Sequence, residues 1–205
     1  SSSVTISNNN IHVEGITFLH AAGSYAPTLI SSTLTLGVAP SNISIFNCTF
    51  KGMQVEQSAI MGSFQRLALR NNQFYDYEPL TSSIVYLASQ CGMLFMENNT
   101  FVDVPGSAVT ATSYDVLTFH NNKFRNCGAD ASNVMPYCVY VQTCYNTSTR
   151  IAFTDNKHHE KNYEYTSGHA RIAAYWIDTL PFIRSTKTGR PKIALTNNIA
   201  GGLDI

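Results

Sequence analysis

The sequence predicts an all-β fold, a right-handed single-stranded parallel β-helix (a solenoid) of about seven coils with an Asn ladder. Three observations support this prediction. An eight-residue motif of the form apolar-x-apolar-x-Asn-x-x-Phe recurs along the chain, a second β-rich segment lies between successive copies, and no stretch shows sustained helical periodicity. Together they favour a stack of short strands over any barrel or repeat that contains helices.

The motif copies define the coils. Clear copies occupy residues 43–50, 67–74, 94–101 and 117–124, weaker copies occupy 151–158 and 193–200, and a degenerate first copy spans 11–18. Their last residues advance along the chain by 32, 24, 27, 23, 34 and 42 positions. A coil of about 24 residues with insertions of variable length is typical of a solenoid.

Each position of the motif has a physical role. The first and third residues are apolar and alternate with polar ones, so a short strand buries one face. The fifth residue suits a sharp bend, because Asn, Asp and Gly tolerate the left-handed backbone region, and the Phe at the eighth position then points inward. Stacked amides at the fifth position can hydrogen-bond from coil to coil. We therefore expect an Asn ladder formed by Asn47, Asn71, Asn98, Asn121 and Asn197, with Asp155 as a variant.

The remaining segments complete the coils. A third short strand per coil is expected in the segments 84–87, 108–112, 138–142 and 171–175. The chain reads as a single domain over residues 1–205, and we expect it to be a fragment of a longer protein. Loop insertions are expected near residues 19–28, 128–137 and 177–191. Cys127 and Cys138 frame the second insertion and are the candidates for a disulfide.

The composition bounds the partners and the setting. The formal net charge is zero, so nucleic-acid binding is not expected. Membrane insertion is not expected either, because the longest apolar runs are far below the roughly 20 residues of a membrane-spanning helix. Abundant Ser, Thr and Asn with several N-glycosylation sequons favour an extracellular, secreted or virion- or cell-surface location. Asn42 and Asn146 lie in connecting segments and are the glycosylation candidates, whereas the sequons at Asn47 and Asn98 fall on the expected ladder.

The Asn-Asn-x-Phe turns, the short strands and the coil length resemble the right-handed β-helix repeat of the pectin-lyase-like superfamily, from about residue 4 to residue 204. The resemblance implies the fold and a glycan partner, because members of this superfamily often contact carbohydrate. It does not select an activity, since the superfamily holds polysaccharide lyases, glycoside hydrolases and non-catalytic surface proteins. The Asn-Thr-Asp, Asp-Asp, His-Gly and Arg-Ile-Lys signatures of its polygalacturonase-like hydrolases do not occur in this chain.

Candidate catalytic residues lie on the strand before the turn. Arg70, Glu97 and His120 occupy its outward position in three successive coils. A carboxylate beside an imidazole could act as a general acid and base, with the guanidinium holding an acidic sugar. The alternative interpretation is a surface charge ladder worth less than about 1 kcal/mol.

Two further surfaces are candidate binding sites. On the strand between motif copies, we expect Tyr86, Tyr140 and either Tyr175 or Arg171 to point outward, where the tyrosine rings could stack on sugars. The alternative is that Tyr is simply a favourable strand residue. On the last strand of the coil, we expect a basic patch formed by Lys123, Arg125, Lys157 and His159. This patch could bind uronate or sulfate groups, or it could simply be solvated surface.

No metal site and no cofactor are predicted, because no His, Asp or Glu cluster has metal-ligand spacing. Lyases that the chain resembles can take Ca²⁺ from carboxylates on separate coils, and Asp76, Glu78 and Asp103 could converge in that way. His158 replaces the inward Phe of its coil, so we expect a buried, hydrogen-bonded side chain there.

Two functions remain open on the sequence. The first is an extracellular or virion-surface β-helix that acts as a structural or fibre element or as a glycan-binding module. The second is a carbohydrate-active enzyme, a polysaccharide lyase or glycoside hydrolase, with a shallow groove on one face. The expected partners are a polysaccharide or glycan, and other copies of the chain or flanking domains of it.

Overall fold

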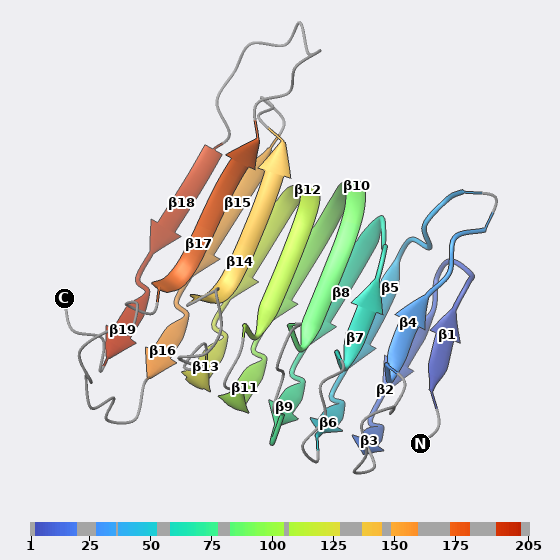
Figure 1. The fold of residues 1–205 in the computed structure, drawn as a ribbon, viewed down its shortest axis with the longest axis horizontal. Coiled ribbons are helices and arrows are strands. Elements are labelled where there is room, and N and C mark those ends of the chain that lie inside the picture. Colours follow the sequence, from blue (N-terminus) through green and yellow to red (C-terminus); the bar gives the residue numbers. More distant parts are fainter. Residues whose placement is uncertain are drawn as a thin grey trace, which may run out of the picture.

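The computed structural model describes residues 3–19, 28–35, 37–52, 58–77, 83–104, 107–127, 137–144, 149–159, 173–180 and 192–201. These residues form strands, turns and bends, and none of them lies in a helix. All strands pair in parallel, with each strand bonded to its equivalent in the next coil (Figure 1). This confirms the predicted right-handed β-helix of seven coils.

Each coil contributes three strand positions. The first position is taken by β1 (Val4–Ile6), β4 (Ile30–Ser32), β7 (Ile60–Gly62), the start of β10 (Val85–Glu97), the start of β12 (Val109–His120), β14 (Tyr137–Cys144) and β17 (Ala173–Leu180). The second is taken by β2 (His12–Glu14), β5 (Ile43–Phe46), β8 (Arg66–Arg70), the ends of β10 and β12, β15 (Arg150–Thr154) and β18 (Lys192–Thr196). The third is taken by β3 (Thr17–Leu19), β6 (Thr49–Lys51), β9 (Gln73–Tyr75), β11 (Thr100–Val104), β13 (Lys123–Cys127), β16 (Lys157–His159) and β19 (Ile199–Gly201).

We call the outward surfaces of these three positions the first, second and third faces. The first and second positions belong to one continuous sheet, because β10 and β12 bend from one into the other without a break. The third positions form a separate seven-stranded sheet, which appears in Figure 1 as the row of short arrows at the bottom.

Inward side chains stack in columns along the axis. Five phenylalanine rings at the end of the motif form one column, with successive centroids 4.9, 4.7, 4.5 and 5.1 Å apart and interplanar angles of 8° or less. They are Phe18, Phe50, Phe74, Phe101 and Phe124. Because neighbouring coils lie about 4.8 Å apart, parallel rings at this spacing fill the interior without a gap. The predicted inward Phe column is confirmed.

The fifth motif position has the predicted left-handed backbone. Its φ angle lies between 50° and 67° in all seven coils, at Gly15, Asn47, Asn71, Asn98, Asn121, Asp155 and Asn197. Most non-glycine residues avoid this region, and Asn and Asp tolerate it best. The bend between the second and third strands therefore explains why the position is confined to Asn, Asp and Gly.

The Asn ladder exists, but the prediction placed it one residue too early. The buried ladder is formed by the sixth motif residue, at Asn72, Asn99, Asn122, Asn156 and Asn198. The predicted members point outward; among them one side-chain bond is seen, from Asn121 Nδ2 to Asn98 Oδ1 at 2.7 Å. The left-handed bend turns the fifth side chain to solvent and the next one into the core.

Each ladder amide makes several bonds. The Oδ1 atom of Asn99 accepts from the backbone N and from the Nδ2 of Asn72, both at 3.0 Å. Its own Nδ2 donates to the carbonyl of Leu69 at 2.8 Å and to Asn122 Oδ1 at 3.0 Å. Asn99 is fully buried, and this pattern repeats up the stack, so the ladder satisfies backbone groups that the bend removes from the sheets.

A second left-handed column, which was not predicted, lies at the end of the third strand. Asp76, Asp103 and Asn126 have φ angles of 59°, 54° and 51° in three successive coils. Asn126 Nδ2 donates to Asp103 Oδ1 at 2.6 Å. At the end of the third strand, the chain therefore changes direction at a short polar residue with a left-handed backbone, as it does in the bend before that strand.

The predicted disulfide is not formed. Cys127 is a free thiol whose Sγ lies 3.4 Å from the carbonyl oxygen of Arg125 and 3.7 Å from that of Phe101. It occupies an inward position in register with Val104, whereas Cys138 lies at the start of the first-position strand β14. Each cysteine thus fills a small apolar position of its own column.

The predicted insertions fall mostly outside the described residues. Their margins are strands: Leu19 ends β3, Tyr137 begins β14, and residues 177–180 belong to β17, in register with Val141 to Cys144. The third insertion accordingly begins later than predicted.

Candidate functional site

The candidate catalytic residues are neighbours on the second face, as predicted. Arg70, Glu97 and His120 are in register on β8, β10 and β12. Arg70 Nε lies 3.2 Å from Glu97 Oε2, but His120 Nδ1 faces Asp155 Oδ2, at 3.6 Å, rather than Glu97. These side chains are 40–52% exposed, so each pair contributes at most about 1 kcal/mol. The geometry is that of a surface charge ladder.

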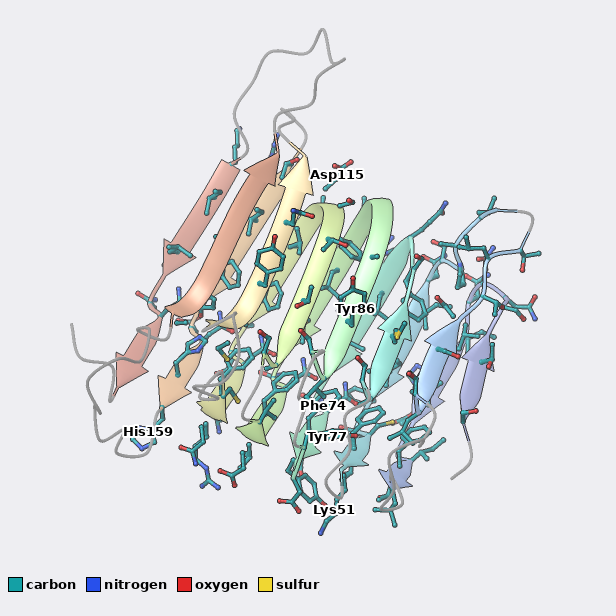
Figure 2. All side chains as sticks on the ribbon, in the orientation of Figure 1. Lys51, Phe74, Tyr77, Tyr86, Asp115 and His159 are labelled. Carbon is teal, nitrogen blue, oxygen red and sulfur yellow. The ribbon has the colours of Figure 1, made fainter. Side chains whose placement is uncertain are left out.

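The first face carries two of the predicted tyrosines. Tyr86 on β10 and Tyr140 on β14 lie on either side of Thr110 on β12, in direct register. Tyr86 is 38% exposed, Met61 beside it on β7 is 45% exposed, and Thr110 between the tyrosines is only 8% exposed. Two coil spacings put the tyrosine backbones about 10 Å apart. Figure 2 labels Tyr86 on this face.

The prediction for Tyr175 is wrong. Tyr175 is in register with the buried Val139, and its ring lies 4.1 Å from that of Phe153. Its hydroxyl donates to Asn198 Oδ1 at 3.2 Å, and burial raises the pKa of this phenol above its ordinary value. In a strand, neighbouring residues point to opposite faces, so Trp176 rather than Tyr175 shares the register position of Tyr140. Arg171 lies outside the described residues.

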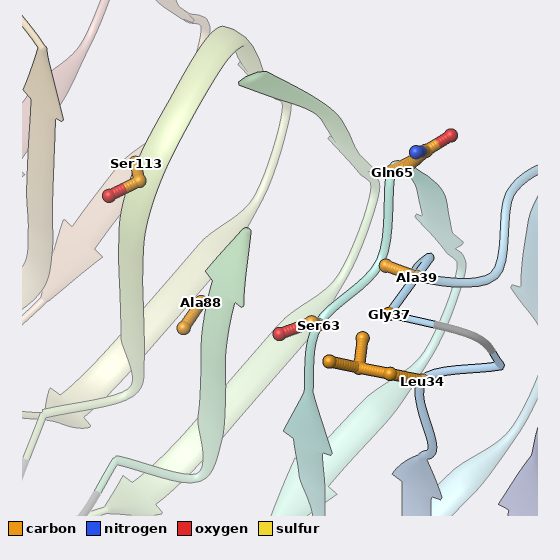
Figure 3. A pocket seen from close by; sticks show the side chains of 7 residues that line it. All are labelled: Leu34, Gly37, Ala39, Ser63, Gln65, Ala88 and Ser113. Carbon is orange, nitrogen blue, oxygen red and sulfur yellow. The ribbon is translucent and has the colours of Figure 1, made fainter. Parts of the chain in front are cut away.

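A groove of about 420 Å³ lies near the bend between the first and second strands (Figure 3). Ala88, two residues beyond Tyr86 on the same side of β10, lies in it. The residues that line the groove are Leu34, Gly37, Ala39, Ser63, Gln65, Ala88 and Ser113. No ionisable side chain is among them.

The wall and the floor of the groove are held by hydrogen bonds. The wall is a tight turn in which the backbones of Thr35 and Val38 exchange two hydrogen bonds of 3.0 Å. In the floor, Ser32 Oγ donates to the carbonyl of Ser63 and accepts from its N–H, both at 2.8 Å. Gly62, at φ 153°, lies against Ser32 so closely that any side chain there would collide with it. This groove was not predictable from the sequence, because its lining residues come from four separate coils.

The predicted basic patch is a compact unit on the third face. Lys123 on β13 is in register with Lys157 on β16, and Arg125 is in register with His159. All four side chains are exposed. We call these four residues the basic block.

The proposed calcium ligands are only partly described. Asp76 and Asp103 occupy equivalent turn positions in adjacent coils, but each faces a cation: Lys51 Nζ at 3.4 Å and Arg125 Nη2 at 3.7 Å. Glu78 lies outside the described residues. Among the residues that are described, no group of three His, Cys, Asp or Glu side chains could hold a metal ion. The calcium site stays a prediction.

His158 is buried, as predicted, and extends the Phe column. Its ring stacks on Phe124 at 4.6 Å and meets Tyr175 edge-on at 4.7 Å. The expected hydrogen bond is not made by Nε2, which has no partner in the described part of the chain. Burial lowers the pKa of His158 to about 4, because a charged imidazolium would have to leave water.

Of the two glycosylation candidates, Asn42 is exposed at a φ of 57°, and its Nδ2 donates to Asn10 Oδ1 at 3.0 Å. Asn146 lies outside the described residues.

A parallel solenoid with stacked asparagines and phenylalanines defines the class of protein. Residues 1–173 match the family model described as "Right handed beta helix region", so the chain belongs to the right-handed β-helix family. No curated protein and no solved structure matches the chain. Among the residues that the structure describes, no helix is long and apolar enough to cross a membrane.

Proposed function

We propose that this protein is a non-catalytic glycan-binding β-helix that holds a neutral sugar chain on its first face. The binding surface consists of Tyr86, Thr110 and Tyr140 together with the groove whose lining includes Ala88, two residues beyond Tyr86. A location outside the cell or on a virion surface is part of this proposal, and the exposed sequon at Asn42 supports it.

The observation that carries the proposal is the combination of spaced tyrosines with an uncharged groove. Aromatic rings offer apolar faces on which the C–H faces of sugars pack, and their hydroxyls remain available for hydrogen bonds. The groove adds Ser63, Gln65 and Ser113 as polar groups, and none of the described residues that line it has an ionisable side chain. An acidic sugar would find no cation there, so a neutral one fits better.

The same surface argues against an enzyme. Glycoside hydrolysis commonly needs two carboxyl groups that flank the scissile bond. The described residues of the groove lining include no carboxyl group, and the candidates Arg70, Glu97 and His120 lie elsewhere, in exposed ion pairs on the second face.

The test is a binding titration with a panel of neutral oligosaccharides, read by intrinsic fluorescence. The double variant Tyr86→Ala/Tyr140→Ala should bind about 5- to 150-fold more weakly, because each lost ring contact is worth roughly 0.5–1.5 kcal/mol. Tyr75→Ala, which removes a tyrosine from the third face, is the matched control and should bind as the unchanged protein does.

Incubation with pectin, alginate and glycosaminoglycans separates binding from catalysis. No unsaturated product and no new reducing ends are expected. Turnover that Glu97→Gln or His120→Gln abolishes would replace the proposal with the enzyme alternative. Equal affinity of the double variant and the unchanged protein would remove the first face from the site.

A further inference from the structure

We propose that the basic block on the third face is a second binding site, which takes a compact oxyanion, a sulfate or phosphate ester. This site lies on a different sheet from the first face, so it does not depend on the function proposed above.

The geometry suits two oxyanion oxygens at once. Lys123 and Lys157 are opposed on adjacent parallel strands, and Arg125 and His159 are opposed two residues further along. The strand spacing is about 4.8 Å and two residues span about 6.6 Å. Four nitrogen-bearing side chains thus surround an area no larger than one or two sulfate groups.

The charges of the two lysines of the block are not neutralised by an ion pair within the described chain. Like charges directly opposed on neighbouring strands are destabilising, and this cost falls on the pair Lys123 and Lys157. Arg125 faces Asp103 at 3.7 Å, but the nearby Asp155 faces His120 on the second face. Neither lysine has an ion pair in the parts of the chain that the structure describes. An external anion would supply the missing counter-charge.

The surroundings limit the size of the anion. The adjoining register positions are neutral on both sides: Thr100 and Val102 on β11, and Ile199 and Gly201 on β19. A long polyanion such as a nucleic acid needs a basic track over many coils, and the net charge of the whole chain is zero. The block is two coils deep, which fits one or two ester groups.

The test uses a fluorescent dextran sulfate oligosaccharide, with unsulfated dextran of the same length as the neutral probe. The full chain should bind the sulfated probe more tightly than the unsulfated one, and added salt should weaken the binding of the sulfated probe. Lys123→Gln/Lys157→Gln should lower the affinity about 3- to 30-fold, whereas Lys123→Arg/Lys157→Arg should retain it. Lys51→Gln, on the same sheet but paired with Asp76, is the matched control and should change little.

Three results would overturn the proposal: equal loss in Lys51→Gln and in the double Gln variant, equal binding of both dextrans, or tighter binding of a DNA duplex than of dextran sulfate. Competition by inorganic phosphate distinguishes the source of the anion. Full displacement identifies the free ion or ester group alone as the ligand, and weak displacement shows that the sugar chain contributes as well. Urea unfolding midpoints of each variant should match that of the unchanged protein, which ties any loss to the site.

Discussion

Two asparagines stand side by side in the same turn, and their environments are opposite. The outer one, as at Asn98, is exposed and has a left-handed backbone. The inner one, as at Asn99, is fully buried and bonds to the coils on both sides. Identical residues therefore have two different roles. The outer one lowers the conformational energy of the left-handed bend, and the inner one forms hydrogen bonds with the polar groups that the bend leaves in the core. A repeated residue therefore has to be assigned to the inner or the outer side of the coil before it is given a role.

The largest effect is expected from breaking the inner column. Asn99→Ala should lower the free energy of unfolding by roughly 3–5 kcal/mol, because it leaves the buried backbone N–H of Asn72 and one N–H of its side-chain amide without an acceptor, at about 1–3 kcal/mol each. Urea denaturation followed by circular dichroism measures the loss. If Asn98→Ala proves as costly as Asn99→Ala, the contrast between the two columns does not hold.

An intermediate, pH-dependent effect is expected at His158, whose side chain points inward from the seven-stranded sheet. Its folded-state pKa of about 4 lies below the ordinary 6.5, so the unfolded chain binds the proton first and stability falls as the pH drops from about 6.5 to 4. The loss approaches roughly 3 kcal/mol at the lower limit. His158→Phe should remove this part of the acid sensitivity by completing the Phe column.

The measurement is the difference in unfolding free energy between His158→Phe and the unchanged protein at several pH values. Carboxylates titrate in both proteins and cancel in that difference. The gap should widen on acidification through this window, and a gap independent of pH would contradict the burial of a neutral imidazole.

The smallest effect is expected in the outer column. Asn98→Ala should cost about 1 kcal/mol, because alanine is strained at a φ of 55°, whereas Asn98→Gly should be close to neutral. Water can replace the exposed bond from Asn121. Thermal unfolding of the two variants side by side checks the order. Glycine proving worse than alanine would show that the side-chain bond, and not the backbone, governs this position.

The fold was predictable because its signal is repeated. The alternation around residues such as Leu67 and Leu69, and the Phe at every coil end, fixed the strands, the inward columns and the left-handed bend. The ladder was misplaced by one residue because Asn-Asn pairs are identical in letters, and only the turn geometry decides which of the two points inward. Cys48 takes the sixth motif position in its coil, and its buried thiol lies 3.7 Å from the carbonyl of Val13. In the later coils an inner amide occupies this place, so an apolar residue here indicates that the sixth position points inward.

The candidate site was less predictable, for two physical reasons. Tyr175 was assigned to the outward side, but the register of its strand differs by one residue from the one assumed. A shift of one residue moves every side chain of a strand to the opposite face of the sheet. The groove comes from small residues such as Gly37, Ser63 and Ala88, which have no chemical signature and meet only after the coils stack. The basic block was predictable, since its four residues recur in two coils at the seventh motif position and at the position directly after the motif.

The inner ladder also has a consequence for how the chain folds. Its rungs join residues 24, 27, 23, 34 and 42 apart in sequence. The entropy lost on closing a loop grows with the logarithm of its length, so the longest rung costs about 0.5 kcal/mol more to close than the shortest. Folding should start where Asn99 meets Asn122, and each later coil then pairs with a strand edge already in place, so that assembly proceeds outward as templated growth.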